Sequence, residues 1–190
     1  MREHIAMSVT TRTVLPTGTW AVDPAHSSVE FSAKHLGIAT VRGVFNDFEG
    51  SFEVGEDGYA RAHGTVQVAS IDTNEDQRDN HLRSEDFFHA ELHPELSFES
   101  TEIRPLDEDA FVIHGELTMR GITRPVALEA ELQGSEIDPW GNERVALEAR
   151  GQLNRGDWGM TFNQALGSGN MLVSDRIKLS LDISAIKQEQ

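Results

Sequence analysis

The side chains in this sequence that could do chemistry are, first of all, its eight histidines. His89 and His93 stand four residues apart, a spacing that places two metal ligands on one face of a helix. Glu91 is in the wrong position for the zinc-protease pattern, and Pro94 indicates that a helix has already ended there. We therefore predict no metal site, and nothing else in the chain calls for a cofactor.

His35 and His81 are the other candidates for polar chemistry, and two roles are open for each. One is a buried histidine whose ring nitrogens are satisfied by hydrogen bonds. The other is a polar contact to a ligand. His81 lies in "RDNHLRSED", where we expect an ion-pair and capping network rather than an acid–base pair; its members are Arg78, Asp79, His81, Arg83 and Asp86. No stretch resembles a nucleophile elbow or a phosphate-binding loop.

The segment "RGDWGMTFNQALGSGN" (155–170) is unusual because a glycine-rich link carries Trp158, Met160 and Phe162. A cluster of large apolar groups in a loop needs an explanation. About twenty residues separate the flanking strands, and so long a link is usually functional or disordered. Since Met and aromatic groups adapt to a flexible chain, we predict that this loop covers one mouth of the fold and contacts a ligand. The alternative is that it plugs an ordinary core.

Composition and charge exclude several classes of protein. The 190 residues suffice for one large domain, and 38% hydrophobic content is that of a globular protein. A net charge of −16 argues against nucleic acid and against anionic membrane surfaces as primary partners. The absence of cysteine excludes disulfides, thiolate metal sites and cysteine nucleophiles.

The N-terminal stretch "MREHIAMSVTTRTVLPTGTW" has no apolar run of signal-peptide length. Nowhere does an apolar run approach a membrane-spanning helix. We expect residues 1–17 to be a loosely ordered extension, residues 18–190 to form one domain, and the protein to be cytoplasmic without stable membrane insertion. Export by a route that uses no such signal stays open.

Period-2 alternation of apolar and polar residues runs through most of the chain and predicts strands with one buried face. It is clearest in 145–153 and 177–187, and it repeats in 111–119 and 126–133. With the short "TWAV" near residue 20, the weaker runs bring the expected number of strands to eight or nine; they lie at 28–34, 43–54, 62–71 and 95–104.

The links between these strands are mostly short and polar, as in 55–58 and 105–109, which predicts antiparallel neighbours in an up-and-down order. Closing such a meander into a barrel removes both free edges, so we predict an all-β, single antiparallel barrel of about eight strands. A sandwich is the competing architecture. Thr73 with Asp76, and then Ser84, predict one or two short helices within 72–92.

An eight-stranded barrel is either filled by its own side chains or wide enough for one ligand. Small residues at positions expected to face inward are consistent with a cavity; they are Ala33, Gly43, Gly115, Ala149 and Gly151. The same glycines could instead relieve twist or mark bulges. The sequence pattern leaves both explanations open.

Several motifs together resemble those of the YceI-like, lipocalin-like family. The opening is "TWAVDPAHSSVEFSAKHLGIATVRGVFNDFEGSF" and the long central motif is "SIDTNEDQRDNHLRSEDFFHAELHPELSFEST". "GELTMRGITRPV" and "RGDWGM" follow in matching order and spacing, so the resemblance covers about residues 18 to 187. It implies an extended antiparallel barrel that holds a long apolar chain such as a polyisoprenoid.

Two features depart from that family. Many relatives are periplasmic with a signal peptide, which this sequence does not show. The family usually has Phe where Trp158 stands, and the larger ring would narrow or shorten a cavity.

We predict non-catalytic binding or carriage of a long-chain amphiphile, by the resemblance a polyisoprenoid, inside the barrel. The predicted ligand-binding residues are Phe31, His35, Phe48, Phe52, His81, Leu82, Phe87, Phe98, Ile113, Leu117, Met119, Arg155, Trp158, Met160 and Phe162. A charged head group would pair with Arg42, Arg83, Arg120 or, as first choice, Arg155. The alternatives are a barrel enzyme acting on a small lipid-like substrate through His35 or His81, and a filled barrel. The sequence leaves a homodimer open.

Overall fold

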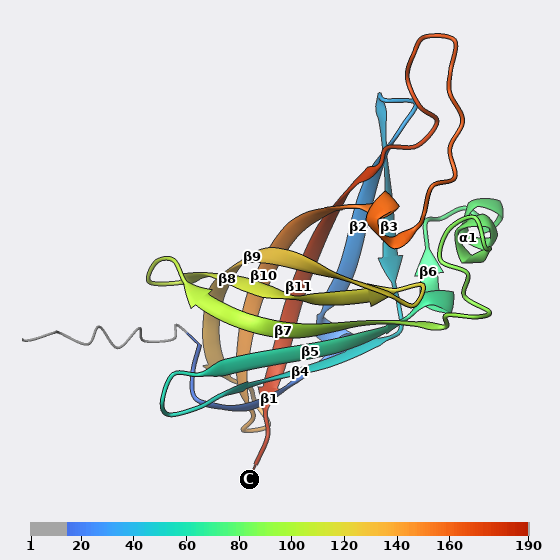
Figure 1. Ribbon diagram of the computed structural model, residues 1–190. Coiled ribbons are helices and arrows are strands. Elements are labelled where there is room, and N and C mark those ends of the chain that lie inside the picture. The colour runs from blue at the N-terminus through green and yellow to red at the C-terminus, as the bar shows by residue number, and fades with distance from the viewer. Residues whose placement is uncertain (1–14, 190) are drawn as a thin grey trace, which may run out of the picture.

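The computed structural model describes residues 15–189, in which strands predominate and enclose one barrel (Figure 1). The strands are β1 (Gly18–Val22), β2 (Ser28–His35), β3 (Ala39–Phe45), β4 (Phe48–Val54), β5 (Ala60–Gln67), β6 (Ile71–Asp72), β7 (Glu95–Pro105), β8 (Ala110–Met119), β9 (Ile122–Ile137), β10 (Glu143–Asn154) and β11 (Arg176–Lys187). The helical elements are η1 (Pro24–His26), η2 (Val68–Ser70), α1 (Asp76–Arg83) and η3 (Arg155–Trp158). Among the described residues, none of the helices has the length and apolar character needed to span a membrane.

Eight strands close the barrel in the order β1-β4-β5-β7-β8-β9-β10-β11, with β1 paired back to β11. All of these pairings are antiparallel, and from β4 to β11 the ring follows the order of the chain. Closure leaves neither sheet edge free along the ring, as the alternation and short links predicted. The barrel is therefore confirmed over the sandwich.

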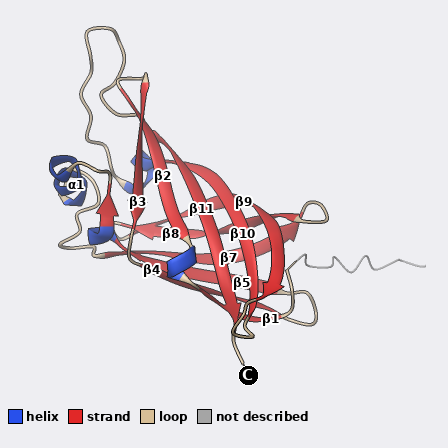
Figure 2. Ribbon diagram, turned by 180° about the vertical axis from the view of Figure 1, so that it is seen from behind, coloured by secondary structure: helices blue, strands red, loops and turns tan. Residues whose placement is uncertain are grey.

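β2, β3 and β6 lie outside the ring. Eleven strands are present where eight or nine were expected, because the expected run 43–54 divides into β3 and β4 and the run 62–71 divides into β5 and β6. β11 pairs with β1 through Ala185–Lys187 and with β2 through Lys178–Asp182. The short helix η1 thus breaks one long flanking segment into two strands. The β2–β3 hairpin leans away from the ring at the end opposite the chain's C-terminus (Figure 2).

One α-helix, α1, forms within 72–92, in agreement with the prediction of one or two. The side chain of Glu75, rather than that of Thr73, caps it by accepting a hydrogen bond from Gln77 N (3.2 Å). Ser84 ends α1 instead of starting a second helix, because its N–H and Oγ both donate to His81 O. Turns without further α-helix follow up to β7.

The largest core lies inside the barrel wall toward the end that carries Gly18 and Lys187, around Trp20, Phe52 and Phe111. Trp20 is fully buried and stacks on Phe52 at 5.9 Å. Leu15, with 6% of its surface exposed, joins the same core, so the packed domain begins before residue 18. The rest of the predicted N-terminal extension, residues 1–14, lies outside the described residues.

Candidate ligand-binding cavity

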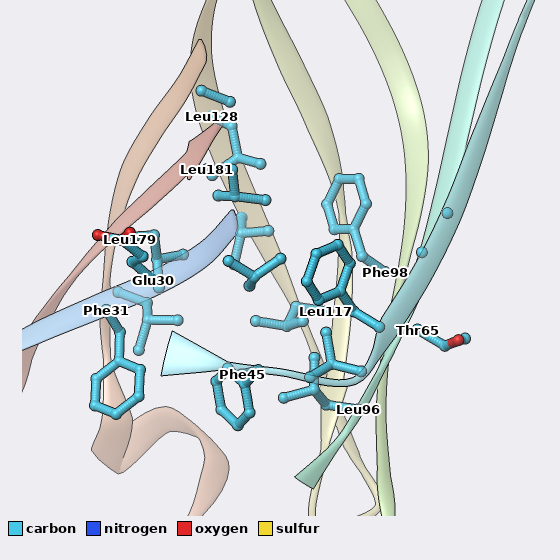
Figure 3. A pocket seen from close by; sticks show the side chains of 18 of the residues that line it. Glu30, Phe31, Phe45, Thr65, Leu96, Phe98, Leu117, Leu128, Leu179 and Leu181 are labelled. Carbon is cyan, nitrogen blue, oxygen red and sulfur yellow. The ribbon is translucent and has the colours of Figure 1, made fainter. Parts of the chain in front are cut away.

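A cavity of about 290 Å³ occupies the interior of the barrel. Its wall comes from strands on all sides of the ring, and Figure 3 shows Phe45, Phe98 and Leu117 turned toward one central space while Thr65 points away. Many of the lining side chains are only half-buried although they face inward, among them Phe31, Phe98, Leu179 and Leu181. Their exposed surface is the surface of the cavity.

Most of the predicted ligand-binding residues line this cavity. They are Phe31, Phe48, Phe52, Leu82, Phe87, Phe98, Ile113, Leu117, Met119, Arg155 and Met160. They come from β2, β4, β7 and β8, from α1 and the turns after it, and from the loop that follows β10. Contact with a ligand stays a prediction for each of them.

The two predicted histidines lie outside the lining. His35 forms a backbone bridge with Val173, which lines the cavity, but His35 itself is not among the lining residues. The ring of His81 accepts or donates a hydrogen bond to Asp86 at 2.8 Å and meets the edge of Phe87 at 5.0 Å. The geometry supports the structural role for His81, that of a histidine held by a hydrogen bond within the protein, over a contact to a ligand.

Trp158 and Phe162 are placed behind the lining rather than in it. Trp158 is 1% exposed and donates from Nε1 to Leu117 O at 2.9 Å, so it buttresses the strand whose side chain faces the cavity. Phe162 packs against Phe87 at 5.5 Å and against His81 at 4.7 Å. Trp158 packs in one cluster with Leu117 and Met160, which line the cavity although Trp158 does not; that its larger ring narrows or shortens the cavity stays a prediction.

The prediction missed a set of lining residues on β3 and on the long strands β9, β10 and β11. They are Phe45, Leu128, Leu147, Leu179, Leu181 and Ile183. The last four are inward members of the two clearest alternating runs in the sequence, and Leu128 belongs to a run that repeats the pattern. The alternation therefore contained the signal that would have found them.

The inward glycines do not create the empty space. A Cβ on Gly43 would lie 2.3 Å from the Phe31 ring, and one on Gly115 would lie 2.3 Å from the Phe98 ring. These glycines let an aromatic ring of a neighbouring strand pack directly against the wall, which is close approach rather than missing filling. The cavity is therefore not formed by space left empty beside Gly43 and Gly115.

Arg155 is the only one of the four candidate head-group arginines in the cavity lining among the described residues. It is 3% exposed; Nη1 donates to Met160 O at 2.7 Å and Nε donates to Ser174 O at 3.0 Å. Nη2 lies 3.2 Å from Asp175 Oδ1 without the geometry of a hydrogen bond, and no other group within residues 15–189 gives it one. Burial lowers the pKa of Arg155, and Asp175 partly offsets this.

The other arginines are engaged elsewhere or exposed. Arg83 donates to Ala69 O and Ile71 O, which ties α1 to η2 and β6. Arg120 donates to Gly159 O at 2.6 Å, and Arg42 is exposed on β3.

The segment 78–86 forms the structural network that its sequence predicted. Buried Asp79 accepts hydrogen bonds from Thr73 N and Thr73 Oγ1 at 2.8 and 2.5 Å. Arg78 donates to the same threonine, so its partner is a hydroxyl and a carbonyl rather than a carboxylate. The hydrogen bond between His81 Nε2 and Asp86 Oδ2 belongs to the same network.

His89 and His93 face each other with ring centroids 6.0 Å apart. Within residues 15–189 no group of three or more His, Cys, Asp or Glu side chains is arranged to hold a metal ion.

Comparison with known proteins gives a consistent result. Residues 20–185 match a family model described as the YceI-like domain. A UPF0312 protein of Photorhabdus laumondii is 42% identical over 144 residues, which cover 75% of this chain and 73% of that protein. Protein YceI of Escherichia coli O6:H1 is 36% identical over 166 residues, covering 86% and 83%.

Among solved structures, a polyisoprenoid binding domain from Saccharophagus degradans superposes with a TM-score of 0.68. The match covers 89% of this chain and 98% of that domain at 12% sequence identity. At this identity the likeness concerns the fold.

Proposed function

This chain belongs to the YceI-like family, and we propose that it binds a long-chain amphiphile in the barrel and carries it without chemical change. The single observation that supports this most is the cavity of about 290 Å³ enclosed by apolar side chains from all around the ring. The Saccharophagus degradans neighbour is described as a polyisoprenoid binding domain, and a polyisoprenoid is the ligand class that we propose here.

The apolar wall stabilises a bound tail relative to water, but not relative to a bilayer. Each methylene removed from water contributes about 0.8 kcal/mol. A polyprenyl chain comes from a bilayer that is equally apolar, however, so its net transfer is close to balance. Selectivity then arises from chain length, cavity shape and head group, which suits a carrier or storage protein.

The size of the cavity limits the tail. Its volume is at the lower end of the range of about 300–1,000 Å³ that is typical of small-molecule sites. Phe87, Met119 and Met160 line it and can repack around a flexible chain. We propose a short tail within the barrel, with the remainder of a longer chain leaving at the end of the cavity that Leu82, Phe87 and Arg155 line.

Arg155 is the residue that we propose for the head group. A buried guanidinium N–H without a hydrogen bond is costly unless an acceptor meets it. Nη2 of Arg155 is in this state, and Arg155 is one of the residues that line the cavity. A hydroxyl, carbonyl or phosphate oxygen of the ligand would satisfy it, and each of these occurs at the polar end of an amphiphile.

A catalytic role has less support from the geometry. The alternative enzyme required His35 or His81 beside the substrate, and neither lines the cavity. Arg155 stays protonated near neutral pH even with a lowered pKa, so it is a poor general base.

Extraction tests the proposal directly. The purified protein is denatured, extracted with organic solvent and analysed by mass spectrometry, and we expect a long-chain compound in stoichiometric amount. Ala62→Phe places a ring in the cavity lining and should abolish recovery and uptake of added polyprenol. Ala146→Phe, at an exposed site on β10, is the matched control and should leave both unchanged. Failure of the wild-type protein to yield or take up any long-chain compound would overturn the proposal.

A further inference from the structure

Two segments far apart in the sequence project together beyond the barrel, as Figures 1 and 2 show. One is the turn of the β2–β3 hairpin and the other is the loop between η3 and β11. Leu36 N donates to Leu172 O at 3.0 Å, and Asn170 Nδ2 donates to Leu36 O at 3.3 Å. Ser174 N donates to the carbonyl of Lys34 at 2.9 Å. We call residues 34–42 and 161–173 together the tip.

The tip exposes large apolar side chains. Ile38 is 75% exposed and Met171 is 44% exposed, while Leu36, Leu166 and Leu172 are half-buried beside them. A solitary exposed apolar residue would need no explanation, but a cluster on a projecting element indicates a contact surface.

The charge of the tip is opposite to that of the molecule. Residues 31–43 and 158–174 contain no Asp or Glu, although the whole chain carries a net charge of −16. Lys34 and Arg42 are exposed on the two strands of the hairpin. This part of the surface is therefore cationic and complementary to an anionic partner, unlike the protein as a whole.

The hairpin turn keeps an apolar residue at a conformational cost. Leu36 and Gly37 have φ values of 56° and 74°, and Ile38 N donates to His35 O at 3.1 Å. A turn whose two central residues both have positive φ favours Asn-Gly, and leucine is strained there. Strain of this kind, maintained at a projecting turn, points to a function of the side chain.

The tip is continuous with the cavity wall. Phe31 and Ala33 on β2 and Val173 at the base of the loop all line the cavity. A chain that leaves the barrel on this side therefore meets the tip next.

We propose that the tip docks reversibly on a lipid bilayer that contains anionic head groups, where the cavity takes up or releases its ligand. Ile38, Met171 and Leu36 enter the head-group region, and Lys34 and Arg42 meet the anionic lipids. The negative charge of the rest of the molecule orients the tip toward the surface and keeps the attachment reversible. This inference rests on the proposed function, since a carrier of a membrane lipid must meet a membrane.

Vesicle flotation tests the docking. Full-length protein is mixed with vesicles of phosphatidylethanolamine and phosphatidylglycerol, or of phosphatidylcholine alone, and the floating fraction is measured. The wild type should float with the anionic vesicles, and more weakly as salt is added. Ile38→Asp combined with Met171→Asp should reduce binding about ten-fold or more, because two charges would have to enter the interface. Trp140→Asp, an equally exposed apolar site at the other end of the barrel, should bind as the wild type does.

Leu36→Asn separates docking from folding. Asparagine tolerates the left-handed conformation, so the melting temperature should rise by roughly 2–4 °C. Vesicle binding should nevertheless fall, because the apolar side chain is gone. Lys34→Gln with Arg42→Gln should abolish the preference for anionic vesicles.

Docking is overturned if the wild type floats with neither kind of vesicle, which would point to a protein partner for the tip. It is also overturned if the double aspartate variant binds as well as the wild type, or if Trp140→Asp loses binding equally. Solvent extraction of the same variants keeps the two proposals apart. A long-chain compound recovered from a wild type that does not float would refute docking and leave lipid binding intact.

Discussion

The two ends of this barrel both expose large apolar side chains, but they differ in the charges around them. At the end formed by the loops 55–59, 105–110 and 138–142, Tyr59, Leu106 and Trp140 are exposed. Glu56 and Asp57 precede Tyr59, and three acidic residues follow Leu106. At the other end, the tip has no carboxylate and adjoins the cavity. Exposure of apolar side chains alone therefore does not distinguish the two ends. The local charge and the continuity with the cavity distinguish the tip as the proposed contact surface.

The arginines at the two ends show the same contrast. Arg144 lies between Asp23 and Asp138, each at 2.8 Å, and hydrogen bonds to these carboxylates raise its pKa. Arg155 lies among backbone carbonyls near the mouth, and burial lowers its pKa. Arg144 is paired with two carboxylates and links β10 to the segments that carry Asp23 and Asp138. Arg155 lines the cavity and keeps one buried nitrogen without a hydrogen bond, as expected if a ligand oxygen completes its set of partners.

The largest difference between the two ends is expected when the tryptophan at each end is replaced by alanine and the free energy of unfolding is compared. Trp158 is 1% exposed and supports Leu117, so Trp158→Ala should lower the free energy of unfolding by about 3–5 kcal/mol. Trp140 is 81% exposed, and Trp140→Ala should change the free energy of unfolding by no more than about 0.5 kcal/mol. Urea denaturation followed by circular dichroism measures both. Equal effects would refute the buttressing role of Trp158.

Replacing Arg155 should have a smaller effect on stability and a specific one on binding. Arg155→Met leaves the carbonyls of Met160 and Ser174 without their donor, at a cost of about 1–3 kcal/mol in urea denaturation. The variant should also bind amphiphiles with a polar head group less tightly while binding of a plain alkane is unchanged. Arg150→Met, at an exposed site on β10, serves as the control for both measurements. If Arg155→Met weakened polar and apolar ligands to the same degree, its effect would be structural only.

Replacing Arg144, the paired arginine at the other end, should have the smallest effect on stability, and this effect should depend on pH. Arg144 and, less strongly, His26 lower the pKa of Asp23 from 3.8 to about 2, and Arg144 with Asn142 lowers that of Asp138 further. A depressed folded-state pKa gives stability that is complete above the unfolded value and is lost as the pH falls. Arg144→Ala should therefore be less stable than the wild type at neutral pH, and the difference should shrink as the pH is lowered from 4 toward 2. A difference independent of pH would contradict this assignment.

The sequence predicted the barrel because alternation is a local property that a closed sheet uses directly. β10 and β11 run almost without interruption where the alternation is cleanest, and their register aligns Leu147 with Ile183 and Ala149 with Leu181. The turn at residues 46–47 and the bend at η2 were not predicted, although each divides one expected run into two strands, one in the ring and one outside it. The number of strands was therefore underestimated.

The site was predicted less completely than the fold. Residue type identified Phe31, Phe98 and Met160 correctly as cavity-facing, but it also suggested Trp158 and Phe162, which lie one layer behind. Whether an aromatic ring faces the lumen or backs it depends on loop geometry that alternation does not encode. Gly43 and Gly115 failed as indicators of empty space because the ring that occupies the place of each missing side chain, Phe31 or Phe98, comes from a neighbouring strand.

The central claim, that the barrel holds the tail of a long amphiphile, is tested most directly by native mass spectrometry. The wild type, Ala62→Phe and Ala146→Phe are incubated with polyprenol-containing vesicles, separated from lipid and measured intact. We predict one bound polyprenol per chain in the wild type and in Ala146→Phe, and none in Ala62→Phe. Only the mass of the bare chain in all three proteins, or equal loading of Ala62→Phe, would contradict it.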